Sequence, residues 1–438
     1  MKNEKCLEII KENEKYIKKE FNYFPFVIKE CKGSIITDYD GNTYIDFLSA
    51  ASSLNLGSCH PVVTKAIKDQ LDKFSHYVLC YVQNREAGEY ARLLTSVYPG
   101  RIKAKVAYTN SGSESIDAAI KYARVFTGRQ KIIYFLNSYH GTTYGSISVS
   151  GISIEMRNKM GPFLPEVYPF PYYGINVSDE VAEKESTKLM EEAFQKYLPA
   201  NEVAAIVIEA IQGDAGILPA HPIFMKKLYN LCKKNGILFI IDDVQHGFFR
   251  SGKMFSIENY EGIIPDGICL AKSFGGGLVG GCFLARKEII DSIGSPGHIA
   301  TFHGNPLTCA AGIAAFGVYY SKEFQDLFQS NIKLLDKLGK DLKEKHQDII
   351  ENIRNIGMTM GIVIKDEDNG NNTYKIIFRC YEKGLFLISL SGNIIRIQPP
   401  LNTPPELLVK GFNIISESLE DFKAGKISNE VLKYKNSW

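Results

Sequence analysis

Between residues 61 and 320 the chain alternates short apolar runs with longer helical stretches, and this rhythm constrains the fold more than any other feature. Several runs are almost continuously hydrophobic, as expected for strands that helices cover on both faces. The rhythm therefore predicts an α/β fold with a mostly parallel sheet. The runs lie at residues 105–108, 131–135, 204–208, 237–241 and 267–270.

The flanking segments follow a different pattern. Residues 35–47 contain two strand-like runs joined by Asp40 and Gly41, which predicts a β-hairpin. From about residue 321 the order becomes helix, strand, helix, strands, helix, which indicates a smaller α+β domain. We therefore predict a large domain at 61–320, a small domain at 321–438, and an N-terminal segment at 1–60 that joins the small domain.

Composition excludes several classes of function. The 51 lysines and arginines balance 49 aspartates and glutamates. The sequence contains no basic stripe of the kind that would indicate a nucleic-acid partner. The nine cysteines are scattered without a Cys-x-x-Cys pair, which disfavours a disulfide framework or a metal site and favours the reducing cytoplasm. The N-terminus lacks the apolar core of a signal peptide. The longest uncharged stretch, residues 305–321, is more typical of a buried helix than of a membrane span. We expect a cytoplasmic protein with no membrane partner.

Polar and glycine-rich segments follow each predicted strand. In open parallel sheets, ligands bind at the carboxyl ends of the strands, so these segments are expected to converge on one site. They lie at residues 110–115, 138–141, 209–214, 242–246 and 272–277.

Lys272 stands at the end of the apolar run DGICLA, and five of the next nine residues are glycine. Burial favours the neutral amine of a lysine, which can condense with an aldehyde. Glycines allow the backbone to approach a planar ligand closely. Taken alone, Lys272 is better explained as a lysine at a strand end that extends to solvent.

Asp242 ends the apolar run GILFIID, and a carboxylate in such surroundings needs a partner. The protonated ring nitrogen of pyridoxal phosphate (PLP) is one such partner. A helix cap, or an ion pair with Arg250, is the structural alternative. Gln245 is placed to bond a ring hydroxyl, or else makes an ordinary loop contact.

Residues 110–115, NSGSES, precede a helical pattern. The turn at Ser111, Gly112 and Ser113 presents backbone N–H groups and the positive end of a helix dipole, which suit a phosphate. Plain N-capping by Ser111 or Ser113 is compatible with this role. Tyr139 follows the next strand and is suited to stack on a cofactor ring, although a core position is equally consistent.

Together these segments resemble the class III aminotransferase family of fold-type I PLP enzymes. The matching motifs include NSGSES, SYHGTTYGS, IEAIQGDAGI, IIDDVQHGFFRSGK, LAKSFGGG and TFHGNPLTCAA. The resemblance implies a large domain with a mostly parallel seven-stranded sheet and PLP as cofactor.

The resemblance also implies residue roles. Lys272 forms the Schiff base with PLP, and Asp242 faces the ring nitrogen. Ser111, Gly112 and Ser113 lie at the phosphate, Tyr139 on the ring and Gln245 near the ring hydroxyl. Thr301 reaches the phosphate of a neighbouring subunit, which implies a homodimer or a dimer of dimers, and Arg396 receives a substrate carboxylate.

Four residues depart from the family pattern. Asp243 replaces a usual glutamate, Phe249 a small residue, His303 a glycine and Val279 a frequent proline. Phe249 and His303 add bulk, which affects the expected substrate range more than the cofactor.

Asp214 stands where many family members carry a glutamate that pairs with the carboxylate-binding arginine. The segments around it resemble more closely the amino-acid racemase and 2-epimerase branch, in which an aspartate here is the proposed second base. Racemisation removes the α-proton from one face and returns it to the other, so two bases suffice, with Lys272 on one face and Asp214 on the other. The simpler explanation is that aspartate only shortens the glutamate by one methylene.

Tyr77, Tyr81, Phe249 and the SLSG segment before Arg396 are expected to line an apolar substrate site. Such a site suits a non-polar, isoleucine-like amino acid and separates neighbouring aliphatic side chains weakly. An aminotransferase is the alternative enzyme. An inactive binding protein is disfavoured because Lys272, Asp242 and the phosphate turn are all present.

Overall fold

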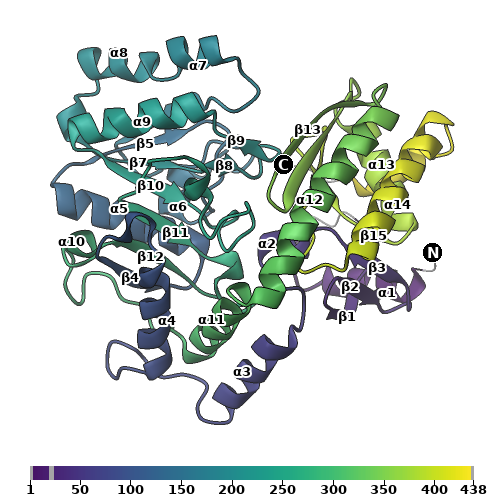
Figure 1. The fold of residues 1–438 in the computed structure, drawn as a ribbon, viewed down its shortest axis with the longest axis horizontal. Helices are drawn as coiled ribbons and strands as arrows, with labels where there is room; N and C mark the ends of the chain where they lie inside the picture. The colour runs from purple at the N-terminus through teal and green to yellow at the C-terminus, as the bar shows by residue number, and fades with distance from the viewer. Residues whose placement is uncertain (1–2, 19–23, 436–438) are drawn as a thin grey trace. The chain divides into compact units, whose positions relative to one another are not determined.

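The computed structural model describes residues 3–18 and 24–435. Its contacts divide the chain into two compact units, which are described separately (Figure 1). The large unit comprises residues 61–320, and the small unit comprises residues 1–60 and 321–438. No helix of the described residues has the length and apolar character needed to cross a membrane.

A seven-stranded sheet forms the centre of the large unit. Its strands, in spatial order, are β4 (Ala104–Thr109), β12 (Gly281–Arg286), β11 (Gly267–Leu270), β10 (Leu238–Asp242), β7 (Val203–Ile208), β5 (Lys131–Phe135) and β6 (Val167–Phe170). Only β12 runs antiparallel to its neighbours, β11 and β4. The predicted mostly parallel α/β sheet is therefore confirmed, and the five predicted runs correspond to β4, β5, β7, β10 and β11.

Helices cover both faces of this sheet. On one face, Leu238 and Ile240 of β10 pack into a core cluster with residues of α5 (Gly112–Thr127). Phe239 lies between them in sequence, and its ring centroid is 5.7 Å from that of Tyr229 in α9 (Pro222–Asn235). Figure 1 shows α7 and α8 beyond α9. The other helices of the unit are α3 (Pro61–Leu71), α4 (Arg85–Ser96), α6 (Tyr144–Ser148), α7 (Asp179–Glu185), α8 (Lys188–Lys196), α10 (Lys287–Ile290) and α11 (Pro306–Tyr319). A two-stranded ribbon, β8 (Ile211–Gln212) and β9 (Leu218–Pro219), follows β7.

The small unit joins the two ends of the chain in one fold. The predicted hairpin is present, and its second strand pairs in parallel with a strand near the C-terminus through Ile45 and Leu385. Tyr44 stacks on Tyr381 with ring centroids 5.2 Å apart. The first sheet contains β1 (Ile28–Lys32), β2 (Ile35–Asp38), β3 (Thr43–Asp46) and β15 (Leu385–Phe386), and the second contains β13 (Ile350–Ile356), β14 (Thr359–Ile364), β17 (Ile394–Ile397) and β16 (Ile388–Leu390). The helices are α1 (Glu4–Asn13), α2 (Ser49–Ser52), α12 (Lys322–Lys345), α13 (Asn371–Glu382) and α14 (Pro405–Lys423).

The short segment α2 is a left-handed turn. All four of its residues, Ser49 to Ser52, have φ between +45° and +66°, although none is glycine. Such backbone costs an L-residue roughly 1–2 kcal/mol, so other contacts must hold it. The Asp46 carboxylate accepts hydrogen bonds from the N–H groups of Leu48 and Ser49, both 2.8 Å, and the Ser49 hydroxyl donates to the carbonyl of Gln398.

Candidate active site

The polar segments that follow the strands of the large unit lie against one another. A Cβ on Gly112, the first residue of α5, would lie 2.8 Å from Val244 Cγ1. A Cβ on Gly213 would overlap the side chain of Gln245. The Ser115 hydroxyl of α5 lies 3.1 Å from the carbonyl of Leu270, two residues before Lys272. The helix start, the Asp242 loop, the Asp214 loop and the Lys272 turn therefore form one site, as their positions after the strands predict.

Lys272 opens a short 3₁₀ turn, Lys272–Phe274, directly after β11. Its φ is +47°, an unfavourable conformation for a non-glycine residue that is often found at functional sites. The glycines after it fit the backbone closely onto α11, because a Cβ on Gly275 or Gly280 would lie 2.6 Å from Thr308 Cγ2. Close packing of the backbone against α11 therefore explains part of the glycine run, which we had attributed to the close approach of a planar ligand.

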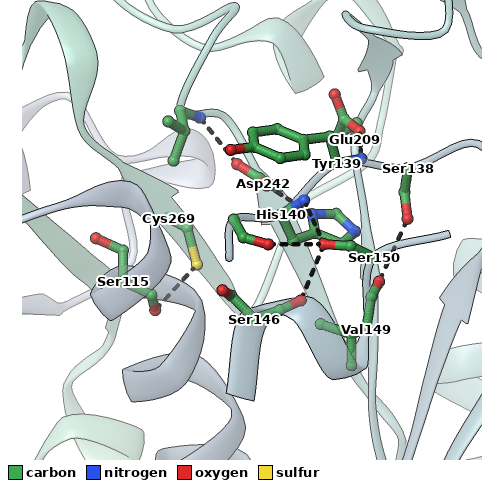
Figure 2. A network of polar contacts seen from close by, with 12 residues as sticks. Ser115, Ser138, Tyr139, His140, Ser146, Val149, Ser150, Glu209, Asp242 and Cys269 are labelled. Carbon is green, nitrogen blue, oxygen red and sulfur yellow. Dashed lines mark hydrogen bonds and ion pairs between the residues drawn. The ribbon is translucent and has the colours of Figure 1, made fainter. Parts of the chain in front are cut away.

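Asp242 is buried and pairs with a histidine. His140 Nδ1 lies 2.6 Å from Asp242 Oδ2, and the Val244 N–H donates to Oδ1 at 3.0 Å (Figure 2). Burial alone would lower the pKa of His140, but the hydrogen bond and charge of Asp242, with the charge of Glu209, raise it above its ordinary value. The ionic partner found for Asp242 is therefore His140, not the Arg250 considered from sequence.

Glu209 is a second buried carboxyl, directly after β7. Its Oε1 accepts the N–H of Tyr139 and its Oε2 accepts the N–H of Gly213, each at 3.0 Å. Figure 2 shows Glu209 beside Tyr139, with His140 and Asp242 in the same polar network. Burial, together with the charge of Asp242, raises the pKa of Glu209 to about 8, although His140 and the two N–H groups act in the opposite direction.

Tyr139 and Asp214 share this environment. Burial raises the pKa of the Tyr139 hydroxyl, and the negative charges of Asp214 and Asp242 raise it further. Both carboxylates therefore lie close enough to the Tyr139 side chain to act on it electrostatically. Asp214 is itself only 6% exposed, in the turn between β8 and β9.

The start of α5 fits a phosphate group. Ser111 caps the helix by accepting the N–H of Glu114, as one of the alternatives predicted. Ser113 does not cap it, because its hydroxyl accepts the N–H of Thr142 at 3.3 Å. Within the described residues, the N–H groups of Gly112 and Ser113 have no protein acceptor, and they point along the positive end of the helix dipole.

The remaining predicted residues are Gln245, Thr301, Tyr77 and Arg396. Gln245 is buried next to Gly213, whereas Thr301 and Tyr77 are exposed in the large unit. Arg396 belongs to β17 of the small unit, where it is buried opposite Gly361. Their assigned contacts with cofactor and substrate stay predictions.

The four departures from the family pattern have distinct surroundings. Asp243 is buried and accepts hydrogen bonds from the N–H and hydroxyl of Ser256. Phe249 packs on Tyr319 and Tyr320 at the end of α11, and its expected place in the apolar substrate site stays a prediction. His303 Nε2 lies 3.5 Å from the Glu114 carboxylate, and Val279 is exposed.

Sequence reasoning missed His140 and Glu209 as members of the site. Both lie in segments that we singled out after predicted strands, residues 138–141 and 209–214. Position in the segment was the available signal, because Glu209 follows β7 directly and His140 lies five residues after the end of β5. The identity of their partners depends on contacts between distant segments.

Comparison with known proteins identifies the family. The model of the class III aminotransferases matches residues 16–419, and the chain belongs to this family. Isoleucine 2-epimerase from Lentilactobacillus buchneri is 34% identical, covering 98% of this chain and 97% of that protein. Leucine/methionine racemase from Thermococcus litoralis is 35% identical, covering 95% of each.

A solved structure agrees with this assignment. An ornithine aminotransferase from Toxoplasma gondii, with partial occupancy of PLP at its active site, has a TM-score of 0.84 and 26% identity, covering 96% of this chain and 95% of that chain. The fold is therefore PLP fold type I, and the cofactor of the chain is pyridoxal phosphate, as the sequence predicted. The open N–H groups at the start of α5 and the buried Asp242 carboxylate are groups that this cofactor requires.

Proposed function

We propose that the chain is a PLP-dependent amino-acid racemase or 2-epimerase that inverts Cα of a non-polar, isoleucine-like amino acid. The buried Asp214 carboxylate, one residue after the Gly213 that packs against Gln245, carries this proposal, because it supplies a second ionisable group in the site that contains Lys272. The similarity to an isoleucine 2-epimerase and a leucine/methionine racemase supports it.

Each residue of the site has a defined task in this proposal. When bound, PLP withdraws electrons from the substrate Cα and so acidifies its hydrogen. Lys272 anchors the cofactor through its amine, and the Asp242 carboxylate, oriented by His140, holds a proton at the ring nitrogen. Ser111, Gly112 and Ser113 hold the phosphate, Tyr139 covers the ring and Gln245 bonds the ring hydroxyl.

Two bases on opposite faces account for inversion. Lys272 removes or returns the α-proton on one face, and Asp214 does so on the other. A single base on one face returns the proton to the side from which it came, which gives exchange without inversion. Asp214 therefore decides between racemisation and simple exchange.

Substrate binding and assembly complete the proposal. Arg396 receives the substrate carboxylate through its planar guanidinium, and Tyr77 lines the side-chain site. Thr301 contacts the phosphate of a second copy in a homodimer or a dimer of dimers. The exposure of Thr301 and Tyr77 in a single chain is consistent with contacts to a second copy. We place the enzyme in the cytoplasm.

An aminotransferase is the second candidate, because the solved neighbour with bound PLP is an ornithine aminotransferase. In that case Asp214 replaces the glutamate that many family members carry, without a role as base. The amino group then passes from an ω- or α-amino acid to a keto acid.

Chirality and proton exchange separate the two activities. The purified enzyme is incubated in deuterated buffer with L-isoleucine, and in parallel with valine, leucine and methionine, with no keto acid. Appearance of the D-allo or D product supports the proposal. If no amino acid inverts, and glutamate accumulates once 2-oxoglutarate is supplied, the enzyme is an aminotransferase.

Variants of Asp214 test the second base. Asp214→Asn should slow inversion at least about 100-fold, because general acid–base groups contribute factors of this size. The visible absorbance of the bound cofactor should stay as in the wild type. Lys272→Ala is the matched control, since it should abolish both that absorbance and the activity. An unchanged inversion rate in Asp214→Asn would remove this residue from the mechanism.

A further inference from the structure

Glu209 connects two backbone segments that are distant in sequence. Its Oε1 accepts the N–H of Tyr139, 70 residues earlier, and its Oε2 accepts the N–H of Gly213, with both distances 3.0 Å. The side chain is 5% exposed, so water does not replace either bond easily. One carboxyl group therefore fixes the separation between the two segments.

These segments carry Asp214, the base proposed for the face opposite Lys272, and Tyr139, the residue proposed to cover the ring. Tyr139 is itself one anchor, and Gly213 directly precedes Asp214. The Gly213 N–H that Glu209 binds lies one residue before Asp214, so this bond also fixes the backbone that carries the Asp214 side chain. Gly213 also lies against Gln245 with no room for a Cβ, which leaves this segment little freedom to move toward the Asp242 loop.

We propose that Glu209 is a positioning residue that holds Asp214 in register with Tyr139 by bridging the backbone amides of Tyr139 and Gly213. The inference rests on the proposed racemase function, because it assigns Glu209 to the Asp214 face of the site. Among the described residues, the hydrogen bonds of the Glu209 carboxyl group go to these two backbone N–H groups. Glu209 therefore influences proton transfer indirectly, through the position of Asp214. Its loss should therefore impair inversion more than exchange at the Lys272 face.

Glu209→Gln provides the test with little change in shape. A glutamine keeps one oxygen but presents an amide N–H₂ group to the other backbone N–H, so at most one of the two bonds survives. Glu209→Asp is the second variant, because it keeps the carboxyl group but is one methylene too short to span both donors. It keeps the test informative if the glutamine variant folds poorly.

Asp38→Asn is the matched control. Asp38 is also a fully buried carboxylate that accepts two backbone N–H groups, those of Asp40 and Asn42, but it lies in the hairpin of the small unit. The variant therefore reproduces the loss of a buried carboxylate without touching the Tyr139 or Gly213 segments.

Hydrogen–deuterium exchange of the PLP-bound protein gives the first readout. In both Glu209 variants, the amide of Tyr139 or Gly213 should exchange at least about tenfold faster than in the wild type, and in Asp38→Asn both should keep the wild-type rate. Wild-type rates at both amides in the Glu209 variants would overturn the bridging role.

The ratio of inversion to proton exchange gives the second readout. For the enantiomer whose α-hydrogen Lys272 removes, exchange with retention should stay within about threefold of the wild type in the Glu209 variants, while inversion falls at least about tenfold. Equal loss of both rates would show a general structural role and overturn the proposal. If the wild type inverts no amino acid, the racemase function itself fails, and the amide exchange rates then decide the bridging role alone.

Discussion

Asp243 makes the most direct prediction, because this chain places a shorter, buried acid where its family usually has glutamate. The carboxylate is 1% exposed and accepts the N–H of Ser256 at 2.9 Å together with the Ser256 hydroxyl. In Asp243→Asn, the amide oxygen can still accept the N–H, and the amide N–H₂ can donate to the hydroxyl, which is able to act as acceptor. The substitution therefore removes a buried charge and keeps both bonds.

The magnitude follows from the pKa of Asp243. Burial, with the charges of Asp242 and Glu258, raises it from 3.8 to about 7, against the opposing effect of the Ser256 hydrogen bonds. The native state therefore binds more protons than the unfolded state between these two values, and the free energy of unfolding falls as pH rises through them. Between pH 5 and pH 8 the wild type loses about 2.5 kcal/mol through this group.

Asp243→Asn has no carboxyl group to bind this proton, so its free energy of unfolding should not fall between pH 5 and pH 8 in the way that the wild-type value does. Its stability relative to the wild type should rise by about 2.5 kcal/mol from pH 5 to pH 8, or by about 5–10 °C in the Tm of the large unit. Thermal melting of the PLP-free protein at four pH values measures it. Ser256→Ala should enlarge the total loss and extend it to higher pH, because it removes a bond that favours the carboxylate and so raises the pKa of Asp243 further. Parallel pH curves for Asp243→Asn and the wild type would refute the reasoning.

Two further changes probe other contacts. His140→Leu leaves the buried Asp242 carboxylate without its ionic partner and should lower the free energy of unfolding by about 3–5 kcal/mol. In His140→Asn the amide nitrogen replaces Nδ1, so the free energy of unfolding should fall by only about 1–2 kcal/mol. Equal losses for the two variants in denaturant unfolding would contradict the pairing. Ala51→Gly should raise the stability of the small unit by about 0.5–1 kcal/mol, because Ala51 has φ +55° and glycine adopts this backbone freely. A lower melting temperature for the glycine variant would show that the turn is not strained.

Periodicity predicted the sheet well because it reports burial. The five predicted runs coincide with β4, β5, β7, β10 and β11 to within one or two residues. The agreement follows most directly for β7, β10 and β11, which are buried along their whole length. Strand β12 was not predicted, because it begins directly after the glycine run, which indicates a loop. Its antiparallel direction depends on pairing with β4 and β11, which no local pattern encodes.

The site could be located from sequence, but its internal contacts could not. The position of Asp242 after an apolar strand indicated a buried carboxylate that needs a partner, and besides the cofactor ring nitrogen and a helix cap, Arg250 was the ionic partner considered within the protein. The partner found is His140, 102 residues earlier. The left-handed turn at Ser49–Ser52 had no local signal either, because it lacks glycine and is held by the Ser49 hydroxyl on the Gln398 carbonyl, 349 residues further along.

The pairing of β3 with β15 has a consequence for the newly made chain. Ile45 of β3 leaves the ribosome early, but its partner Leu385 is made only after the whole large unit. At about 5–20 residues per second, this interval lasts roughly 20–70 s. During that time the outer edge of β3 is open to pairing with the wrong strand. The small unit, whose two segments lie before and after the large unit in the chain, therefore completes its folding after the large unit has been made.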